Sequence, residues 1–137
     1  EEPPGSTDFR RDALRGSSAY ARAHAGEIGS MILLDYVANR GLRLPREGTS
    51  DRALWARLRA AAGRAGTLAA FPTGAQGGII DDHTPFLDEG VPSIDLIDFA
   101  YPWRDTLQDD LSRVSARSLD VTGETVTDLV LRERARR

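Results

Sequence analysis

Short apolar segments constrain the fold of this sequence more than any other feature. The clearest is Met31–Leu34, an uninterrupted run that continues into Asp35–Val37. A short run without alternation indicates a strand buried on both faces, as in a parallel sheet with helices above and below. A turn of a core helix is the alternative, but the run is too short for most helices. Thr67–Phe71, stopped by Pro72, and Ser93–Phe99 are predicted as two further strands.

Helical patterns surround these strands. Serine or aspartate can cap the helix starts, a proline lies in one first turn, and apolar residues repeat at helical spacing. In chain order, the predicted helices are Gly16–His24 with Ser17 or Ser18 as N-cap, a helix from Ser50-Asp51 to Gly66 with Leu54, Leu58 and Ala62 on one face, a short helix with an acidic cap from Asp81 through Pro85 to Gly90, and a last helix with Leu119, Val126, Leu129 and Val130 facing inward. Residues 1–15 and 40–50 are predicted loops. The order predicts an α/β fold, layered helix–sheet–helix with a mostly parallel sheet.

Composition removes several classes of function. The chain has 137 residues, enough for one domain, and no cysteine, which excludes disulfide scaffolds, thiolate zinc sites and cysteine nucleophiles. All 18 basic residues are arginine, so lysine chemistry is excluded. The net charge of −3 argues against a nucleic-acid partner, and no apolar run approaches the ~18 residues of a membrane span. With His24 and His83 alone, the chain cannot build a histidine-rich metal site.

Acidic residues follow the predicted strands. Asp35 ends the first strand, Asp98 lies near the end of the third, and Asp81 and Asp82 follow a glycine-rich loop. Ligands of open α/β sheets bind outside the carboxyl ends of the strands. Carboxylates that meet there repel one another unless a cation, a proton or an arginine lies between them, and zinc accepts Asp, Glu and His ligands. Helix capping is the alternative interpretation of these acids.

Longer motifs carry a family resemblance over essentially the whole chain. The segment Gly77–Pro92, which contains Asp-Asp-His-Thr-Pro-Phe and Gly-Val-Pro, continues into Ile94–Phe99 and Tyr101-Pro102. Leu33-Leu34-Asp35 and the pair Glu1-Glu2 add two weaker matches. Together these segments closely resemble the family that includes zinc-dependent aminopeptidases and glutaminyl cyclases.

The resemblance implies a role for several acids. Glu1 would be the general base and Glu2 a zinc ligand. Asp35 would bind the second zinc in peptidases or serve as a hydrogen-bonding catalytic group in cyclases. Asp81 matches the acid that cyclases place near the reacting amide. Zinc is the cofactor that this resemblance implies, and the amino terminus of a peptide is the implied partner.

Two departures from the family pattern bear on the site. Asp105 stands where the family has a zinc-binding histidine, so it becomes a candidate ligand of different charge and reach. Trp103 and Arg104 precede it, and Arg104 could pair with the acids and replace the charge of the metal. Asp82 and His83 are expected to support the site, with His83 packed rather than bound to metal. His24 is expected to lie on a surface helix.

The second departure concerns what precedes Glu1. The family's first zinc histidine and its metal-bridging aspartate lie upstream of the glutamate pair. Residues 1–137 are therefore expected to be the C-terminal portion of one zinc-peptidase-like domain, inactive alone. Such a portion exposes a sheet edge, which predicts possible self-association through that edge. The sequence is compatible with the cytoplasm and with export.

Three functions are consistent with these residues. The leading prediction is an aminopeptidase-type hydrolase, in which metal-activated water attacks and Glu1 shuttles the proton. The first alternative is a glutaminyl-peptide cyclotransferase, which Asp81 favours. The second is a non-catalytic relative that serves as a binding module, which Asp105 and Arg104 favour.

Overall fold

The computed structural model describes residues 8–135, so Glu1 and Glu2 lie outside the described residues. Two parallel strands and five helices make up the described fold, with short 3₁₀ turns at 25–27, 68–70 and 111–113. In chain order the helices and strands are α1 (Phe9–Asp12), α2 (Arg15–His24), β1 (Met31–Asp35), α3 (Arg52–Ala65), α4 (Thr84–Asp88), β2 (Ser93–Ile97) and α5 (Ala116–Arg134). No helix in this described range is both long and apolar enough to cross a membrane.

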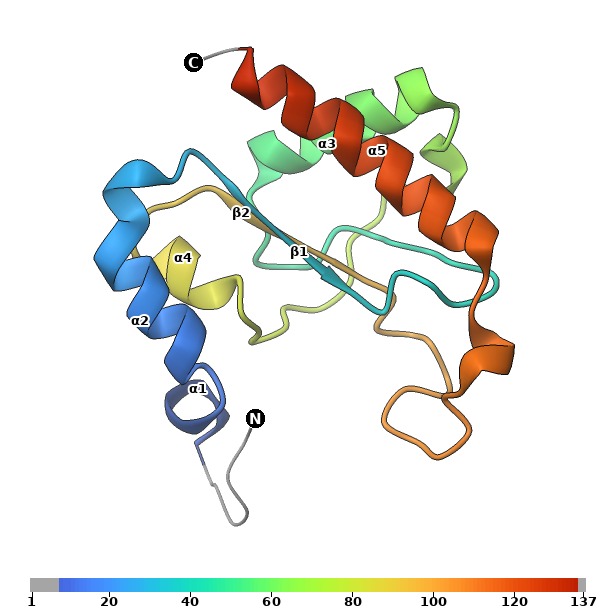
Figure 1. Cartoon of the computed structure of the whole chain (residues 1–137), viewed down its shortest axis with the longest axis horizontal. Helices are drawn as coiled ribbons and strands as arrows, with labels where there is room; N and C mark the ends of the chain where they lie inside the picture. The colour runs from blue at the N-terminus through green and yellow to red at the C-terminus, as the bar shows by residue number, and fades with distance from the viewer. Residues whose placement is uncertain (1–7, 136–137) are drawn as a thin grey trace.

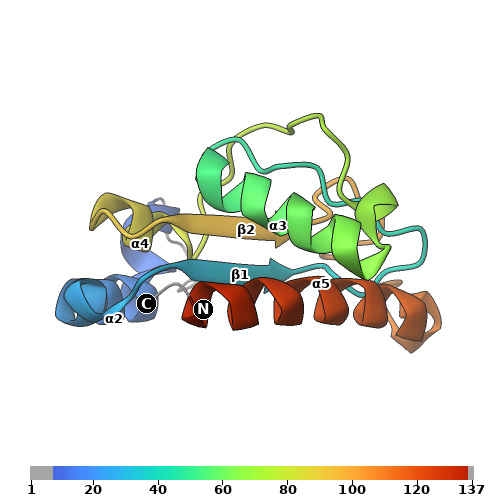
Figure 2. The same ribbon diagram turned by 90° about the horizontal axis from the view of Figure 1, so that it is seen from above.

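Helices cover both faces of the two-stranded sheet. Figure 1 shows α3 and α5 on one face and α2 and α4 on the other. In Figure 2, α3 runs beside β2 and α5 beside β1. The strands pair in register, with Leu33 opposite Asp95 and Asp35 opposite Ile97. This arrangement confirms the predicted helix–sheet–helix layers and the parallel sheet, and it shows that the first and third predicted strands are the ones that pair.

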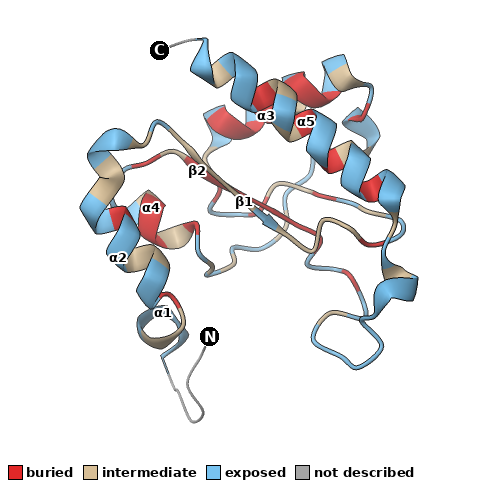
Figure 3. Cartoon of the chain, viewed as in Figure 1, coloured by how far each residue is buried: buried red, intermediate tan, exposed pale blue. Residues whose placement is uncertain are grey.

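The main core lies between the sheet and the α3/α5 layer. Ile94 and Leu96 of β2 are fully buried there. They share this core with Leu58 of α3, Leu129 of α5 and Phe71, which follows the 3₁₀ turn at 68–70. Side chains alternate between the two faces of a strand, so Ser93, Asp95 and Ile97 point toward the α2/α4 layer. β2 is buried along its whole length, as Figure 3 shows in red. Its sequence therefore places one acidic side chain in the interior of the protein.

The prediction of a strand at Thr67–Phe71 is wrong. α3 ends at Gly66, which adopts the left-handed conformation with φ 74° and turns the chain back. The amides of Ala70 and Phe71 then bond to carbonyls three residues earlier, so they are not available to a sheet. Leu68–Ala70 is a 3₁₀ turn, and only Phe71 enters the core.

β1 is less buried than its apolar sequence predicts. All its side chains are half-buried or exposed, and Leu34 is 46% exposed, because β2 is the only strand beside it among the described residues. Burial on both faces, which the run predicts, therefore holds for β2 and not for β1. Association through the exposed edge stays a prediction.

Helix boundaries follow local signals where these are strong. Asp51 caps α3 by accepting a hydrogen bond from the amide of Leu54, as predicted. The predicted serine cap of α2 is wrong, because the N-cap is Leu14, three residues before Ser17, and α1 lies inside the predicted loop 1–15. On α5, Leu129 is buried, but Leu119 and Val130 remain partly exposed, contrary to the prediction that they face inward.

Candidate active site

The carboxyl end of β1 gathers acidic side chains from three segments of the chain. Asp35, the last residue of β1, is half-buried. Burial raises the pKa of its carboxyl, and the negative charges of Asp81, Asp105 and Asp82 raise it further, while the amide of Tyr36 opposes them. The structure therefore brings Asp81, Asp82 and Asp105 within electrostatic reach of Asp35.

Asp81 and Asp82 form the turn before α4. The carboxylate of Asp81 accepts a hydrogen bond of 2.6 Å from the amide of Asp82, and the amide of Asp81 donates to the hydroxyl of Thr84 at 3.1 Å. The predicted acidic cap of this helix is wrong, because α4 starts after His83 and no side chain caps it. The Asp81 carboxylate closes its own turn instead, which keeps it near the end of the sheet.

Asp105 lies against the end of β1. It accepts a hydrogen bond of 2.9 Å from the hydroxyl of Tyr36. Burial and this bond to Asp105 raise the pKa of Tyr36 to about 12. Both residues have left-handed backbones, with φ 44° at Tyr36 and φ 59° at Asp105. The guanidinium of Arg104 lies 3.6 Å from Asp105 Oδ2, the carboxylate oxygen that Tyr36 does not bond. It also stacks on the ring of Phe99. Among the acids of the site, Arg104 therefore pairs with Asp105.

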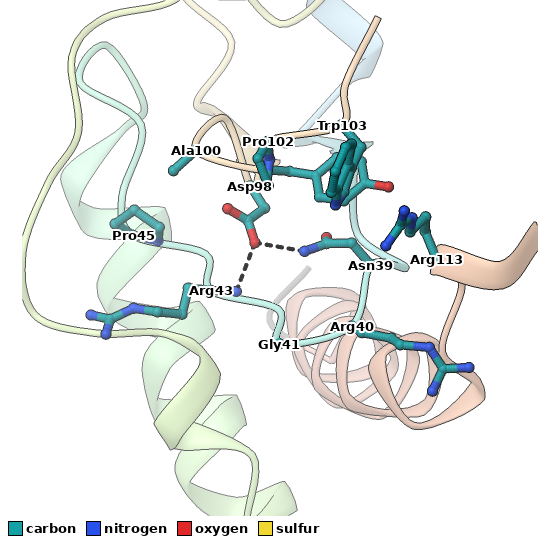
Figure 4. Close-up of a pocket in the computed structure, with 11 residues that line it drawn as sticks. Asn39, Arg40, Gly41, Arg43, Pro45, Asp98, Ala100, Pro102, Trp103 and Arg113 are labelled. Atoms are coloured by element: carbon teal, nitrogen blue, oxygen red, sulfur yellow. Dashed lines mark hydrogen bonds between the residues drawn. The ribbon is translucent and has the colours of Figure 1, made fainter. Parts of the chain in front are cut away.

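Trp103 belongs to a separate pocket of about 360 Å³, shown in Figure 4. The guanidinium of Arg113 covers its ring at 4.2 Å. Asp98 lies in the same pocket, where its carboxylate accepts hydrogen bonds from the side-chain amide of Asn39 at 2.9 Å and the backbone amide of Arg43 at 3.0 Å. Asp98 thus has its own hydrogen-bond donors, and the prediction that it converges with the other acids is not supported by these contacts.

A buried glutamate that the sequence analysis missed lies behind the acids. Glu47 is fully buried and accepts hydrogen bonds from the amides of Thr49, Ser50 and Ile79 and from the hydroxyls of Thr49 and Ser50, all between 2.8 and 2.9 Å. Burial alone would raise its pKa, but hydrogen bonds from His83, Thr49 and Ile79 hold the pKa of Glu47 far below its usual range. Glu47 is therefore a negative charge in the interior at neutral pH. Its segment, residues 40–50, reads as an ordinary loop and offers no signal for this role.

Two more buried ionisable groups adjoin Glu47. His83 is fully buried, as predicted for a packed residue, and its Nε2 lies 3.3 Å from a Glu47 oxygen. Asp95 of β2 is also fully buried, and its Oδ2 lies 4.0 Å from His83 Nδ1. Sequence analysis missed Asp95, although a carboxylate between Ile94 and Leu96 in an apolar strand is expensive to bury and was a usable signal.

The described residues do not form a metal site on their own. Within residues 8–135 no group of three or more His, Cys, Asp or Glu side chains is arranged to hold a metal ion. Of the predicted zinc ligands, Asp35 and Asp105 lie at the end of β1, while Glu2 is outside the described range. Zinc remains an expectation for the family.

The fold and the acids together define a layered α/β domain whose site lies at the carboxyl ends of parallel strands. The profile of peptidase family M28 matches residues 1–130, and the chain belongs to that family. This confirms the resemblance. A comparison with the curated proteins found no match.

Solved structures of glutaminyl cyclases and of an aminopeptidase share the fold. The chain is 27% identical to a glutaminyl cyclase from an Acidobacteriales bacterium (TM-score 0.83, 92% of this chain and 47% of that one). It is 26% identical to that of Fimbriiglobus ruber (TM-score 0.78, 85% and 43%). A leucine aminopeptidase precursor from Bacteroides thetaiotaomicron is 23% identical (TM-score 0.82, 93% and 46%). The chain spans less than half the length of each of these proteins.

Proposed function

We propose that the full-length protein acts on the amino termini of peptides as a glutaminyl cyclase. The observation that carries this proposal is the effect of Asp81 on Asp35 at the carboxyl end of β1, where burial first and then the charge of Asp81 raise the pKa of Asp35. Asp81 stands where the family resemblance puts the acid of cyclases. Two like charges at such a site favour retention of a proton by one of them. The identity to two solved cyclases supports the same choice.

The chemistry requires one proton to be taken and one to be given. The amino nitrogen of the peptide attacks the carbon of its own glutamine side-chain amide, the amide C–N bond breaks, and ammonia leaves. Glu1, outside the described residues, is expected to take the amine proton. The Asp35–Asp81 pair would hold the proton that the leaving ammonia needs, and general acid catalysis of this kind contributes roughly 10²–10⁴-fold.

A second candidate is the aminopeptidase-type hydrolase that the sequence favoured. It is supported by the carboxylates of Asp35 and Asp105 on either side of Tyr36, which could serve as metal ligands together with Glu2. The fold shared with the leucine aminopeptidase precursor is compatible with it. The pairing of Arg104 with Asp105 favours the third candidate, a non-catalytic binding module.

One assay set distinguishes these candidates. The full-length protein is incubated with a glutaminyl peptide, and pyroglutamate and ammonia are measured beside the hydrolysis of aminoacyl anilides and the metal content. Cyclase function predicts pyroglutamate formation, and Asp81→Asn should lower its rate by roughly 100-fold or more, since the proton-holding pair is lost.

Asp82→Asn is the matched control for this variant. It changes the neighbouring acid of the same turn, and its effect should stay within a few-fold. Anilide hydrolysis with no pyroglutamate would select the aminopeptidase. If the protein forms neither product and binds no metal, the binding module is the remaining candidate.

A further inference from the structure

Glu47, His83 and Asp95 form a buried array directly behind the proposed site. All three are fully buried, and they come from three segments: the loop before α3, the residue before α4 and the middle of β2. His83 lies two residues after Asp81 in the chain. Whatever holds the His83 ring therefore also holds the backbone that carries Asp81. The function proposed above does not otherwise use these groups.

Hydrogen bonds fix one end of the His83 ring. The hydroxyl of Thr49 donates its single hydrogen to the Glu47 carboxylate at 2.8 Å. The same hydroxyl oxygen lies 2.8 Å from His83 Nε2, so it can only accept there. Nε2 must therefore carry a hydrogen, which assigns the tautomer of the neutral ring and leaves Nδ1 as its only site for a further proton.

The other end of the ring faces a carboxyl group that lacks hydrogen bonds. His83 Nδ1 and both Asp95 oxygens are buried and have no hydrogen-bond partner among the described residues. The 4.0 Å between Nδ1 and Oδ2 is about 1 Å longer than a hydrogen bond, so the two groups face each other without being bonded. A buried carboxylate without a partner is costly, and a bare imidazole nitrogen beside it can hold the missing proton.

The surrounding charges also favour a proton at this place. Asp95 faces the carboxylates of Asp81 from the turn, Asp35 from β1 and Glu47 from the loop, while His83 is the one facing group that opposes them. Burial first, and then these three negative charges, raise the pKa of Asp95 to about 7. A proton shared between Asp95 and His83 removes one buried negative charge. It breaks no existing hydrogen bond, because neither His83 Nδ1 nor the Asp95 carboxyl has a partner among the described residues.

We propose that His83 and Asp95 hold one buried proton between them, and that this proton fixes the turn carrying Asp81. While the proton is present, the His83 ring is bound at both ends, by Thr49 and Glu47 on one side and by Asp95 on the other. When it is lost, Asp95 and Nδ1 no longer attract each other, and the turn at 81–83 loosens. The importance of the shared proton for catalysis rests on the proposed cyclase function. The presence of this proton between His83 and Asp95 does not depend on that function.

Imidazole NMR tests the proposal. Full-length protein labelled with ¹⁵N-histidine is titrated from about pH 5 to about pH 9, and the His83 signals are assigned by their loss in His83→Gln. In the wild type, Nε2 should stay protonated throughout, while Nδ1 should lose its share of a proton with a midpoint near neutral pH. The amide signal of Asp82, which donates to Asp81, should move with the same midpoint.

Asp95→Asn is the decisive variant. Asparagine cannot take up a proton, so the near-neutral change at Nδ1 and the matching shift of Asp82 should both be lost. Asp98→Asn is the matched control, because it removes another buried carboxylate, just beyond the end of β2, that has its own donors. It should leave the His83 signals unchanged.

Other outcomes decide against the proposal. A His83 signal that titrates alike in wild type and Asp95→Asn would overturn it, as would a wild-type ring that carries no hydrogen on Nε2 or shows no change over the range. If Asp95→Asn fails to fold, the carboxyl carbon of Asp95 in ¹³C-labelled wild-type protein is followed instead: its signal should titrate with the same midpoint as Nδ1, and a carboxyl signal that does not change over the range would overturn the proposal. A full-length protein with no cyclase activity would refute the proposed function and leave these signals as expected.

Discussion

The two faces of β2 have opposite characters. On the α3/α5 face, Ile94 and Leu96 enter a close-packed apolar core. On the α2/α4 face, the neighbouring Asp95 meets His83 and Glu47, all of them fully buried. The apolar face gains free energy from burial, whereas the polar face gives some of it up to keep charges in the interior. Stability and chemistry are thus divided between two sides of a single five-residue strand.

Of the changes that test this comparison, removing apolar volume from β2 is expected to lower the free energy of unfolding most. Leu96→Ala leaves a cavity in the α3/α5 core and should lower the free energy of unfolding by about 3–4 kcal/mol. The loss should be the same at acid and neutral pH, because the side chains of this core cluster are apolar. Urea unfolding at two pH values measures it. A loss that varied with pH would mean that the two faces are coupled.

Neutralising Glu47 should have the next largest effect. Glu47→Gln puts an amide among five hydrogen-bond donors and is expected to cost about 3 kcal/mol at neutral pH. Because the folded-state pKa is depressed, the carboxylate stabilises the fold above its ordinary pKa of 4.5, and this contribution is lost as the pH falls. The difference between variant and wild type should therefore shrink in acid. Thermal unfolding from neutral to acid pH would show it, and a constant difference would contradict the role.

Asp95→Asn should have the smallest effect on the free energy of unfolding, and it should raise this free energy instead of lowering it. The folded-state pKa is raised from 3.8 to about 7, so the folded protein binds a proton that the unfolded chain has lost. Wild-type stability is then complete below 3.8 and falls as the pH rises through 7. The variant lacks this decline and should be more stable by about 2 kcal/mol at pH ~8, less than the full shift implies because an unpaired amide stays buried. A wild type whose stability rises over this range would contradict the assignment.

Sequence patterns predicted the parts of the fold that depend on neighbouring residues. The α3 boundaries follow from Asp51 and Gly66, and the two strands follow from short apolar runs. Thr67–Phe71 has the composition of a strand, but the turn at Gly66 directs its amides to carbonyls within the same turn. Its structure is set by the chain around it and could not be read from five residues.

The site divides in the same way. The place of Asp35 was predictable, because parallel strands end at one edge of a sheet, whereas the family resemblance, and not a strand end, pointed to Asp81. The role of Glu47 was not predictable: four of its five donors come from Thr49 and Ser50 in its own loop, but the fifth, the amide of Ile79, reaches it only through the fold. Asp95 lies between these cases: its position in an apolar strand predicts a buried charge, while its neighbour His83 is fixed only by packing.

The left-handed backbone of Asp105 limits what evolution can place there. Besides glycine, that conformation is best accepted by Asn, Asp and His, and it disfavours branched and bulky residues. Exchange between an aspartate and a histidine at 105 therefore needs no rebuilding of the loop, and in the genetic code it needs only one base change. The same loop backbone is therefore compatible with a carboxylate or an imidazole beside Tyr36.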